Sequence, residues 1–161
     1  MLDAGAFYAG ISFLSSDTQL YTTSDIIAEV GHIKSQFAAI DGLRVSGRLV
    51  IQEPDQSQTE KVLLAAAKTG DRKAISQADV SIVALALQLA KTLVTDDYAV
   101  ANVAAILGVE VKPATSGKEI QETRRWTYYC IGCSRTFSSS EKVCPLCGNK
   151  LKRKYKIFGK Y

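Results

Sequence analysis

The four cysteines of the chain form two Cys-x-x-Cys pairs in one short C-terminal stretch. Ten residues separate the two pairs. This spacing is typical of tetrahedral sites in which four thiolates bind one Zn²⁺ ion. Gly132, Gly148 and Pro145 favour the tight turns that such pairs require. Because four protein ligands leave no open position, the predicted zinc site is structural. Its predicted ligands are Cys130, Cys133, Cys144 and Cys147.

Disulfide bonds are the alternative reading of these cysteines. The N-terminus lacks the composition of a signal peptide, so we expect the reducing cytoplasm, where disulfides are rare. No apolar run is long enough to span a bilayer, and we expect no membrane association. The cysteine spacing and the expected compartment both favour zinc.

Carboxylates offer a second kind of chemistry. Asp3 and the pair Asp96-Asp97 each follow a predicted strand, and Asp79 lies in the first turn of a predicted helix. Since ligands of parallel sheets bind at the carboxyl ends of the strands, we expect these acids at one edge, joined by Glu29 from another helix. Carboxylates this close repel one another unless a hard dication neutralises them, so Mg²⁺ or Mn²⁺ is implied. Two such ions can hold the attacking and leaving oxygens of a phosphodiester displacement.

Each of these acids also has a purely structural reading. Ser76-x-x-Asp79 fits a helix capping box, and Asp3 or Asp96 can be a helix N-cap. Glu29 can be part of a solvated helix face. The metal hypothesis depends on all of them meeting at one edge.

The elements that must position these residues alternate between short apolar strands and helices, which indicates an α/β fold with a parallel sheet flanked by helices. Residues 1–112 are the predicted α/β domain, 113–124 a linker, and 125–161 a small zinc ribbon with a basic tail. The predicted strands or β-prone segments are Met1–Ala4, Leu43–Val45, Leu49–Ile51, Thr92–Thr95 and Val109–Val111. The predicted helices are Gly5–Leu14, Ser24–Gly31 with Ser24 as its cap, Ile33–Ile40, Gln58–Thr69, one beginning at Ser76, and Tyr98–Leu107.

Charge divides the chain into two unlike parts. Residues 1–111 have a formal charge of −5 and residues 112–161 have +9. A basic metal module attached to an acidic domain suggests a polyanionic partner, and the interleaved aromatic side chains favour single-stranded nucleic acid. The residues predicted to bind this nucleic acid are Arg124, Arg125, Lys150, Lys152, Arg153, Lys154, Tyr155 and Lys156.

The order of the motifs resembles that of PIN-domain nucleases. Leu2-Asp3-Ala4-Gly5, Ser76-x-x-Asp79 and Leu93-Val94-Thr95-Asp96-Asp97 match the family's acidic motifs, with Glu29 between them. A PIN-like domain followed by a linker and a four-cysteine ribbon is similar to the archaeal form of the Nob family. That family consists of endonucleases that mature the 3′ end of small-subunit ribosomal RNA.

The resemblance implies a metal-dependent endoribonuclease that cleaves single-stranded precursor rRNA and leaves a 5′-phosphate and a 3′-hydroxyl. Asp3, Asp79, Asp96 and Asp97 are then the Mg²⁺ or Mn²⁺ ligands, and Glu29 binds or orients the attacking water. Whether Asp96 or Asp97 is the inner ligand stays open at this point. The small ribosomal subunit and ribosome-assembly factors are the implied partners.

Three other functions fit parts of the pattern. A non-catalytic assembly factor would bind ribosomal RNA or protein through the ribbon, although the complete set of acids argues against an inert domain. A toxin-type PIN ribonuclease is disfavoured by the ribbon. A phospho-acceptor receiver domain needs an acid pair after its first strand, whereas Asp96-Asp97 comes late in the domain.

Overall fold

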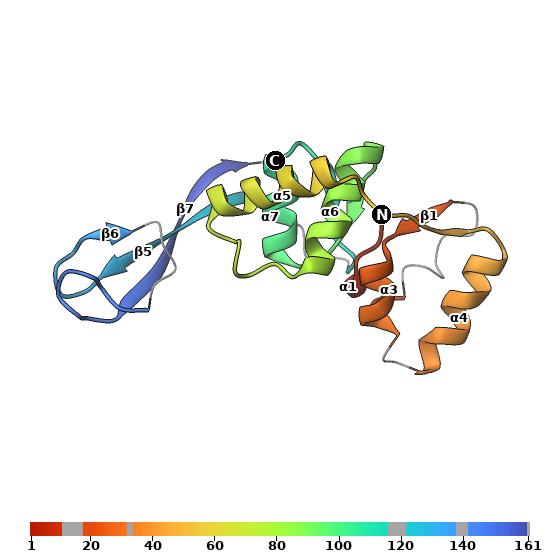
Figure 1. The fold of residues 1–161 in the computed structure, drawn as a ribbon, viewed down its shortest axis with the longest axis horizontal. Helices are drawn as coiled ribbons and strands as arrows, with labels where there is room; N and C mark the ends of the chain where they lie inside the picture. The colour runs from red at the N-terminus through yellow and green to blue at the C-terminus, as the bar shows by residue number, and fades with distance from the viewer. Residues whose placement is uncertain (11–17, 32–33, 116–121, 138–141, 161) are drawn as a thin grey trace.

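The computed structural model describes residues 1–10, 18–31, 34–115, 122–137 and 142–160. The molecule is elongated, with a helical body from which a long strand pair projects at one end (Figure 1). The body contains a parallel sheet, and the strand pair ends in the cysteine-containing turns. The mixed architecture confirms the predicted fold class of a parallel sheet flanked by helices with a four-cysteine ribbon.

The parallel sheet is assembled from two strand pairs and the N-terminal segment between them. β1 (Leu20–Thr22) pairs with β2 (Leu49–Ile51), and β3 (Leu93–Val94) pairs with β4 (Val111–Lys112). Residues 1–3 lie between β1 and β3 and form a parallel bridge to β3. The order across the sheet is therefore β2, β1, residues 1–3, β3 and β4.

Hydrogen bonds on both sides fix this N-terminal segment. The Leu2 N–H donates to the Tyr21 carbonyl at 3.0 Å, and the Val94 N–H donates to the Met1 carbonyl at 2.9 Å. The Thr22 hydroxyl donates to the Leu2 carbonyl at 3.0 Å. Leu2 is fully buried as a result, and Asp3 follows it at the carboxyl edge of the sheet.

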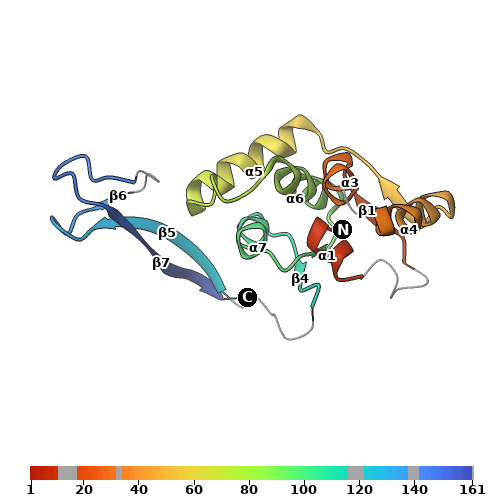
Figure 2. The same ribbon diagram turned by 90° about the horizontal axis from the view of Figure 1, so that it is seen from below.

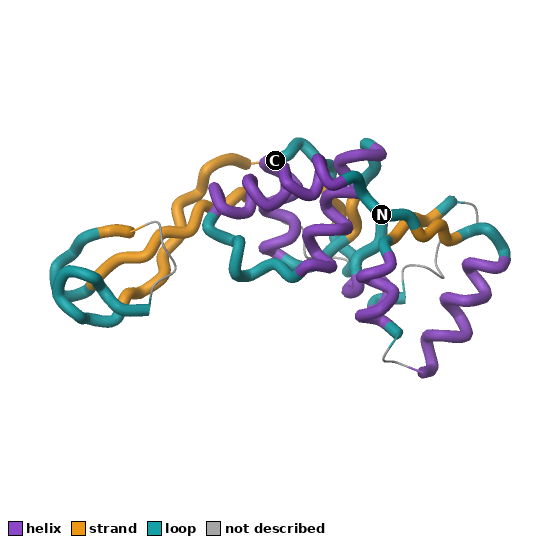
Figure 3. The backbone as a smooth tube through the Cα atoms, in the orientation of Figure 1, coloured by secondary structure: helices purple, strands orange, loops and turns teal. Residues whose placement is uncertain are grey.

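Helices cover the sheet and supply most of the core (Figures 2 and 3). In α6, the run Val80–Ala86 is buried without interruption, which explains why this helix is apolar on nearly all sides. The α5 helix packs on α6 and also contacts α7. The helix bounds are α1 Ala4–Tyr8, α3 Ser24–Val30, α4 Lys34–Val45, α5 Gln56–Thr69, α6 Gln77–Leu89 and α7 Tyr98–Ile106.

Several predicted element bounds differ from the structure. The β-prone segment Leu43–Val45 is the end of α4, because Ile40 and Leu43 keep a helical period of buried residues and the helix ends only before Gly47, whose φ is +71°. β1 is a strand that the sequence pattern missed. Helix α3 is capped by Thr23 and not by Ser24.

Two bounds near the ends of the body also shift. The first helix reaches Tyr8, and residues 11–14 of the longer predicted helix lie outside the described residues. The last body strand is β4 and not Val109–Val111.

The projecting strand pair, which we call the stalk, consists of β5 (Glu122–Cys130) and β7 (Leu151–Lys160) in antiparallel register. The short β6 (Thr136–Phe137) adds to β5 near the far tip. β5 begins inside the segment expected to be a linker, and the end of the stalk nearest the body packs on α5 and α7. The stalk is thus attached to the body by contacts as well as by the chain.

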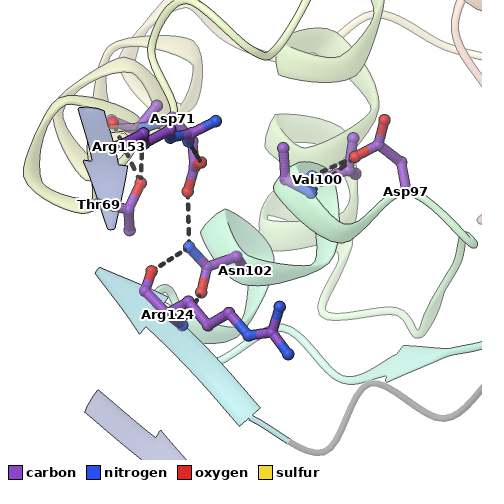
Figure 4. A network of polar contacts seen from close by, with 9 residues as sticks. Thr69, Asp71, Asp97, Val100, Asn102, Arg124 and Arg153 are labelled. Atoms are coloured by element: carbon purple, nitrogen blue, oxygen red, sulfur yellow. Dashed lines mark hydrogen bonds and ion pairs between the residues drawn. The ribbon is translucent and has the colours of Figure 1, made fainter. Parts of the chain in front are cut away.

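A buried polar network joins the stalk to the body (Figure 4). The Asn102 side chain of α7 pairs with the Arg124 backbone as a strand would, since its Oδ1 accepts from the Arg124 N–H and its Nδ2 donates to the Arg124 carbonyl, both at 2.7 Å. The same Nδ2 donates to Asp71 Oδ2 at 2.6 Å. Arg153 of β7 donates to Asp71 Oδ1 at 3.2 Å. We call Asp71, Asn102, Arg124 and Arg153 the junction network.

Burial makes the junction network sensitive to the loss of any member. Asn102 and Asp71 are 0% and 1% exposed. Burial raises the pKa of Asp71, while the hydrogen bonds from Asn102 and Thr69 and the charge of Arg153 act in the opposite direction. A buried carboxylate with three such partners is retained only where they all stay in place.

Replacing Asn102 tests the junction network. Asn102→Ala leaves the backbone N–H and carbonyl of Arg124 and one oxygen of Asp71 without their partner, and each unsatisfied buried group costs about 1–3 kcal/mol. We expect the free energy of unfolding, measured by urea titration, to fall by about 2–4 kcal/mol. Gln56→Ala, which removes an exposed amide bonded to Glu60, is the control and should change little. A loss no larger than in the control would show that the network does not stabilise the protein.

Candidate active site and metal centre

Asp3 lies at the centre of the acidic edge. It directly follows the central segment of the sheet and caps α1, its Oδ1 accepting from the Ala6 N–H at 2.6 Å. The side chain is 5% exposed and also interacts with the hydroxyl of Thr95, which follows β3. Asp3 is therefore held by the first turn of α1 and by Thr95 at the end of β3.

Asp79 and Asp97 approach the same edge from the starts of two helices. Asp79 Oδ2 accepts from the Ser76 N–H at 2.7 Å, which completes the capping box of α6. Asp97 Oδ1 accepts from the Ala99 and Val100 N–H groups at 2.7 and 3.2 Å and caps α7. Each carboxylate uses one oxygen as a helix cap, and the other oxygen accepts no hydrogen bond from the described residues. Asp79 and Asp97 can therefore cap a helix with one oxygen and still offer the other oxygen to a metal ion.

The three acids influence one another electrostatically. Burial raises the pKa of Asp3, the Thr95 and Ala6 hydrogen bonds lower it, and the charges of Asp79 and Asp97 raise it further. The net direction is upward. The ionised form of Asp3 is therefore unfavourable in the protein alone, and a cation at this edge would favour it.

The described carboxylates at this edge do not form a close set of ligand atoms. In the described part of the chain, only the cysteines place three or more ligand atoms within 4.8 Å of one another. Mg²⁺ usually keeps several waters and binds through one or two carboxylates, so wider spacing still fits such an ion. The donor set of hard oxygens fits Mg²⁺ or Mn²⁺.

The two remaining predicted acids lie in different settings. Both oxygens of Asp96 are occupied, because Oδ1 accepts from the Ala114 and Thr115 N–H groups at 2.9 and 3.2 Å and Oδ2 from the Thr115 hydroxyl at 2.6 Å. Asp96 thus ties the start of α7 to the loop after β4. Glu29 is exposed on α3, and it is not among the groups whose charge shifts the pKa of Asp3.

The four cysteines meet at the tip of the stalk. Their sulfurs lie within 4.8 Å of one another, with Cys130 and Cys147 at 3.3 Å and Cys133 and Cys144 at 3.7 Å. Zn–S bonds of about 2.3 Å in a tetrahedron place sulfurs about 3.8 Å apart, so this cluster fits a metal ion. The Gly132 and Cys133 N–H groups donate to the Cys130 sulfur at 3.3 and 3.5 Å.

The thiols of this cluster do not ionise alike without a cation. Hydrogen bonds from the Asn149 side chain and backbone lower the pKa of Cys147 to about 6. A backbone hydrogen bond at Arg135 favours the Cys133 thiolate, but burial and the three adjacent thiols raise the pKa of Cys133 to about 11. A bound dication would stabilise all four thiolates together.

Alternation along β7 separates the predicted RNA-binding residues into two groups. Lys152, Lys154 and Lys156 are exposed on one face of the stalk. On the other face, Arg153 lies 3.7 Å from the Trp126 ring centroid and bonds to Asp71. Alternate residues of a strand point to opposite faces, which explains the division.

The remaining predicted basic and aromatic residues are mostly at the junction. The Arg124 guanidinium lies between the rings of Tyr98 and Tyr155, at 4.4 and 4.3 Å from their centroids. Tyr155 is 45% exposed and packs edge-on against Trp126. Lys150 is exposed near the tip, and the side chain of Arg125 lies outside the described residues.

The sequence pattern missed two contributions to these sites. Thr95 supports Asp3, and Asn102 anchors the stalk. The signal for Asn102 was an amide in the otherwise apolar run Tyr98–Ile106, because a polar side chain on a buried helix face requires a partner.

No helix in the described ranges is both long and apolar enough to cross a membrane.

Comparison with known proteins agrees with this arrangement. A family model described as the PIN domain of ribonuclease matches residues 1–89. Endoribonuclease Nob1 of Pyrococcus abyssi is 35% identical over 94% of this chain and 91% of its own length. Endoribonuclease Nob1 of Methanocaldococcus jannaschii is 34% identical over 96% of this chain and 76% of its own length. Ribonuclease VapC1 of Thermoplasma acidophilum is 36% identical over 96% of this chain and 77% of its own length.

These alignments extend over the body, the stalk and the cysteine-containing tip, and every relative named is a ribonuclease. The family model alone covers more than half of the chain. The chain therefore belongs to the PIN-domain ribonucleases, within the Nob1 endoribonuclease family.

Proposed function

We propose that this protein is a metal-dependent endoribonuclease that cleaves single-stranded precursor rRNA at the 3′ end of the small-subunit rRNA. The observation that supports this most is Asp3, a carboxylate whose pKa is raised chiefly by its burial and further by the nearby charges of Asp79 and Asp97. A cluster of this kind is costly for stability alone and useful for binding a dication. Membership of the Nob1 family supplies the substrate class.

The acids have different roles in this proposal, which follow from their positions. Asp3, Asp79 and Asp97 hold Mg²⁺ or Mn²⁺, and Asp96 supports them by fixing the start of α7. When bound, such an ion neutralises phosphate charge and acidifies water. Glu29 orients the attacking water from α3. The phosphodiester then yields a 5′-phosphate and a 3′-hydroxyl.

The stalk and its tip hold the substrate. The four cysteines bind Zn²⁺, which orders the tip, and Lys150, Lys152, Lys154 and Lys156 contact phosphates. Arg124, Arg153 and Tyr155 position the stalk on the body and border the RNA path. The substrate lies within the small ribosomal subunit in the cytoplasm.

Asp3→Asn tests the catalytic assignment. Removing the central ligand charge is expected to slow Mn²⁺-dependent cleavage of a short RNA that spans the 3′ boundary by at least about a hundredfold, since metal charge stabilisation is worth several kcal/mol. Cleavage is followed on denaturing gels with Mn²⁺ or with EDTA. Asp55→Asn is the matched control, because Asp55 is an exposed helix N-cap whose side chain makes no capping hydrogen bond. Cleavage by Asp3→Asn at the wild-type rate would refute the assignment.

Asp3→Asn should impair cleavage but stabilise the folded protein when no metal ion is added. The raised pKa of Asp3 means that the folded protein binds this proton more tightly than the unfolded chain, whose Asp has a pKa near 3.8. Stability from this group is complete below that value and is lost as the pH rises through the folded pKa. Without added Mg²⁺ or Mn²⁺, Asp3→Asn should therefore have a higher Tm than wild type at pH 7, and the difference should shrink towards pH 4. A lower Tm of Asp3→Asn than of wild type at pH 7 would contradict the raised pKa of Asp3.

Cys144→Ser tests the zinc site. Cys144 is buried at the tip, and a hydroxyl is a poor replacement for a thiolate ligand. We expect zinc measured by mass spectrometry to fall from one ion per chain to a small fraction, while far-UV circular dichroism of the helical body persists. Full zinc retention in the variant would exclude a four-cysteine site.

A further inference from the structure

A cleft separates the C-terminal end of α5 from the stalk and lies apart from the acidic edge. It has a volume of about 520 Å³ and is lined from the body by Lys68 and Gly70 and from the stalk by Trp126, Phe137, Lys154 and Lys156. It has no acidic side chain among the described residues that line it. The two walls come from segments far apart in the sequence, so the cleft exists only while the stalk is docked.

Positive charge faces the cleft from both walls. Lys68 is exposed in the last turn of α5, and Lys154 and Lys156 are exposed on one face of β7, two residues apart. Cations that converge without an acidic partner favour a ligand with negative charge at more than one point. A chain of phosphates meets that condition.

Two aromatic residues and small side chains complete the lining. Trp126 and Phe137 are both half-buried. The Trp126 ring packs against the Arg153 guanidinium and, edge-on, against Tyr155, whose centroid is 5.2 Å away. Because Trp126 pairs with Tyr155 and Thr127 with Lys154, this ring points to the face of the stalk opposite Lys154 and borders the cleft only at its rim.

Gly70 sets how closely the two walls approach at the base of the cleft. Its φ is +79°, and a Cβ at this position would lie 3.1 Å from the Trp126 carbonyl oxygen and 3.3 Å from the Trp126 Cβ. The backbone of the body therefore touches the stalk with no side chain between them. The cleft volume lies in the range of small-ligand sites, which suits a short unpaired stretch.

Lys68 also has a structural alternative, because cations near helix C-termini interact favourably with the helix dipole. Two carbonyls in the last turn of α5 are already satisfied by the chain. The Gly70 N–H donates to the Ala67 carbonyl at 3.3 Å, and the Asp71 N–H donates to the Ala66 carbonyl at 2.9 Å. The helix end therefore does not need Lys68 as a cap.

We propose that this cleft is an RNA subsite that binds a short unpaired stretch of the substrate, with phosphates on Lys68, Lys154 and Lys156 and with Trp126 at its rim. The identity of the ligand as RNA rests on the proposed function. Because Lys68 belongs to the nuclease body, the body and the stalk both contact the same RNA strand.

The experiment measures binding without cleavage. A fluorescein-labelled ten-nucleotide oligouridylate is titrated without added Mg²⁺ or Mn²⁺, and anisotropy is recorded at several salt concentrations. Lys68→Gln should weaken binding several-fold and reduce the slope of log K against log salt by about 0.7, the value for one phosphate contact in a single strand. An unlabelled oligouridylate should quench the emission of Trp126, the only tryptophan in the chain.

The control is Lys61→Gln, which removes the same charge from the same helix about 10 Å away. It should bind the oligonucleotide as wild type does. Wild-type affinity and slope in Lys68→Gln, or equal affinity of the wild type for a blunt RNA duplex, would overturn the subsite. Failure of the proposed function would appear separately, as absence of Mn²⁺-dependent cleavage by a wild type that still binds.

Discussion

The burial of a carboxylate, Asp3, at the edge of the sheet and close to two further acids is the constraint on which the rest depends. Asp3 is buried at the end of the central segment, and Asp79 and Asp97 add their charges from the starts of α6 and α7. Each acid also caps a helix, so local hydrogen bonds hold it in place. Since burial and the two nearby charges raise the pKa of Asp3, a cation bound at this edge would favour the ionised carboxylate.

The same helix that presents Asp97 also holds the stalk. Tyr98 and Asn102 lie four residues apart on α7, and both contact Arg124 of β5. The position of the basic stalk relative to the acidic edge is therefore set within little more than one helical turn. This coupling explains how a nuclease body with an acidic character can present RNA to its own carboxylates, since the positive charge needed to hold the strand comes from the stalk.

Sequence patterns predicted the parts of this structure that depend on local chemistry. The cysteine spacing predicted the thiol cluster, and Ser76-x-x-Asp79 predicted the start of α6 and its capping box. Patterns failed where distant partners decide the outcome. β1 is a strand only because β2 and residues 1–3 flank it, and Asn102 acquires its role only from Arg124. The different surroundings of Asp96 and Asp97 likewise come from the loop after β4, whose groups occupy both oxygens of Asp96.

The most direct measurement is the location of Mn²⁺ in crystals of the protein by anomalous scattering. An anomalous peak within coordinating or water-bridged distance of Asp3, Asp79 and Asp97 is the predicted result, and Asp3→Asn crystals should lose it. Crystals that contain Mn²⁺ but show no peak at this edge would contradict the assignment of the three carboxylates as a metal site.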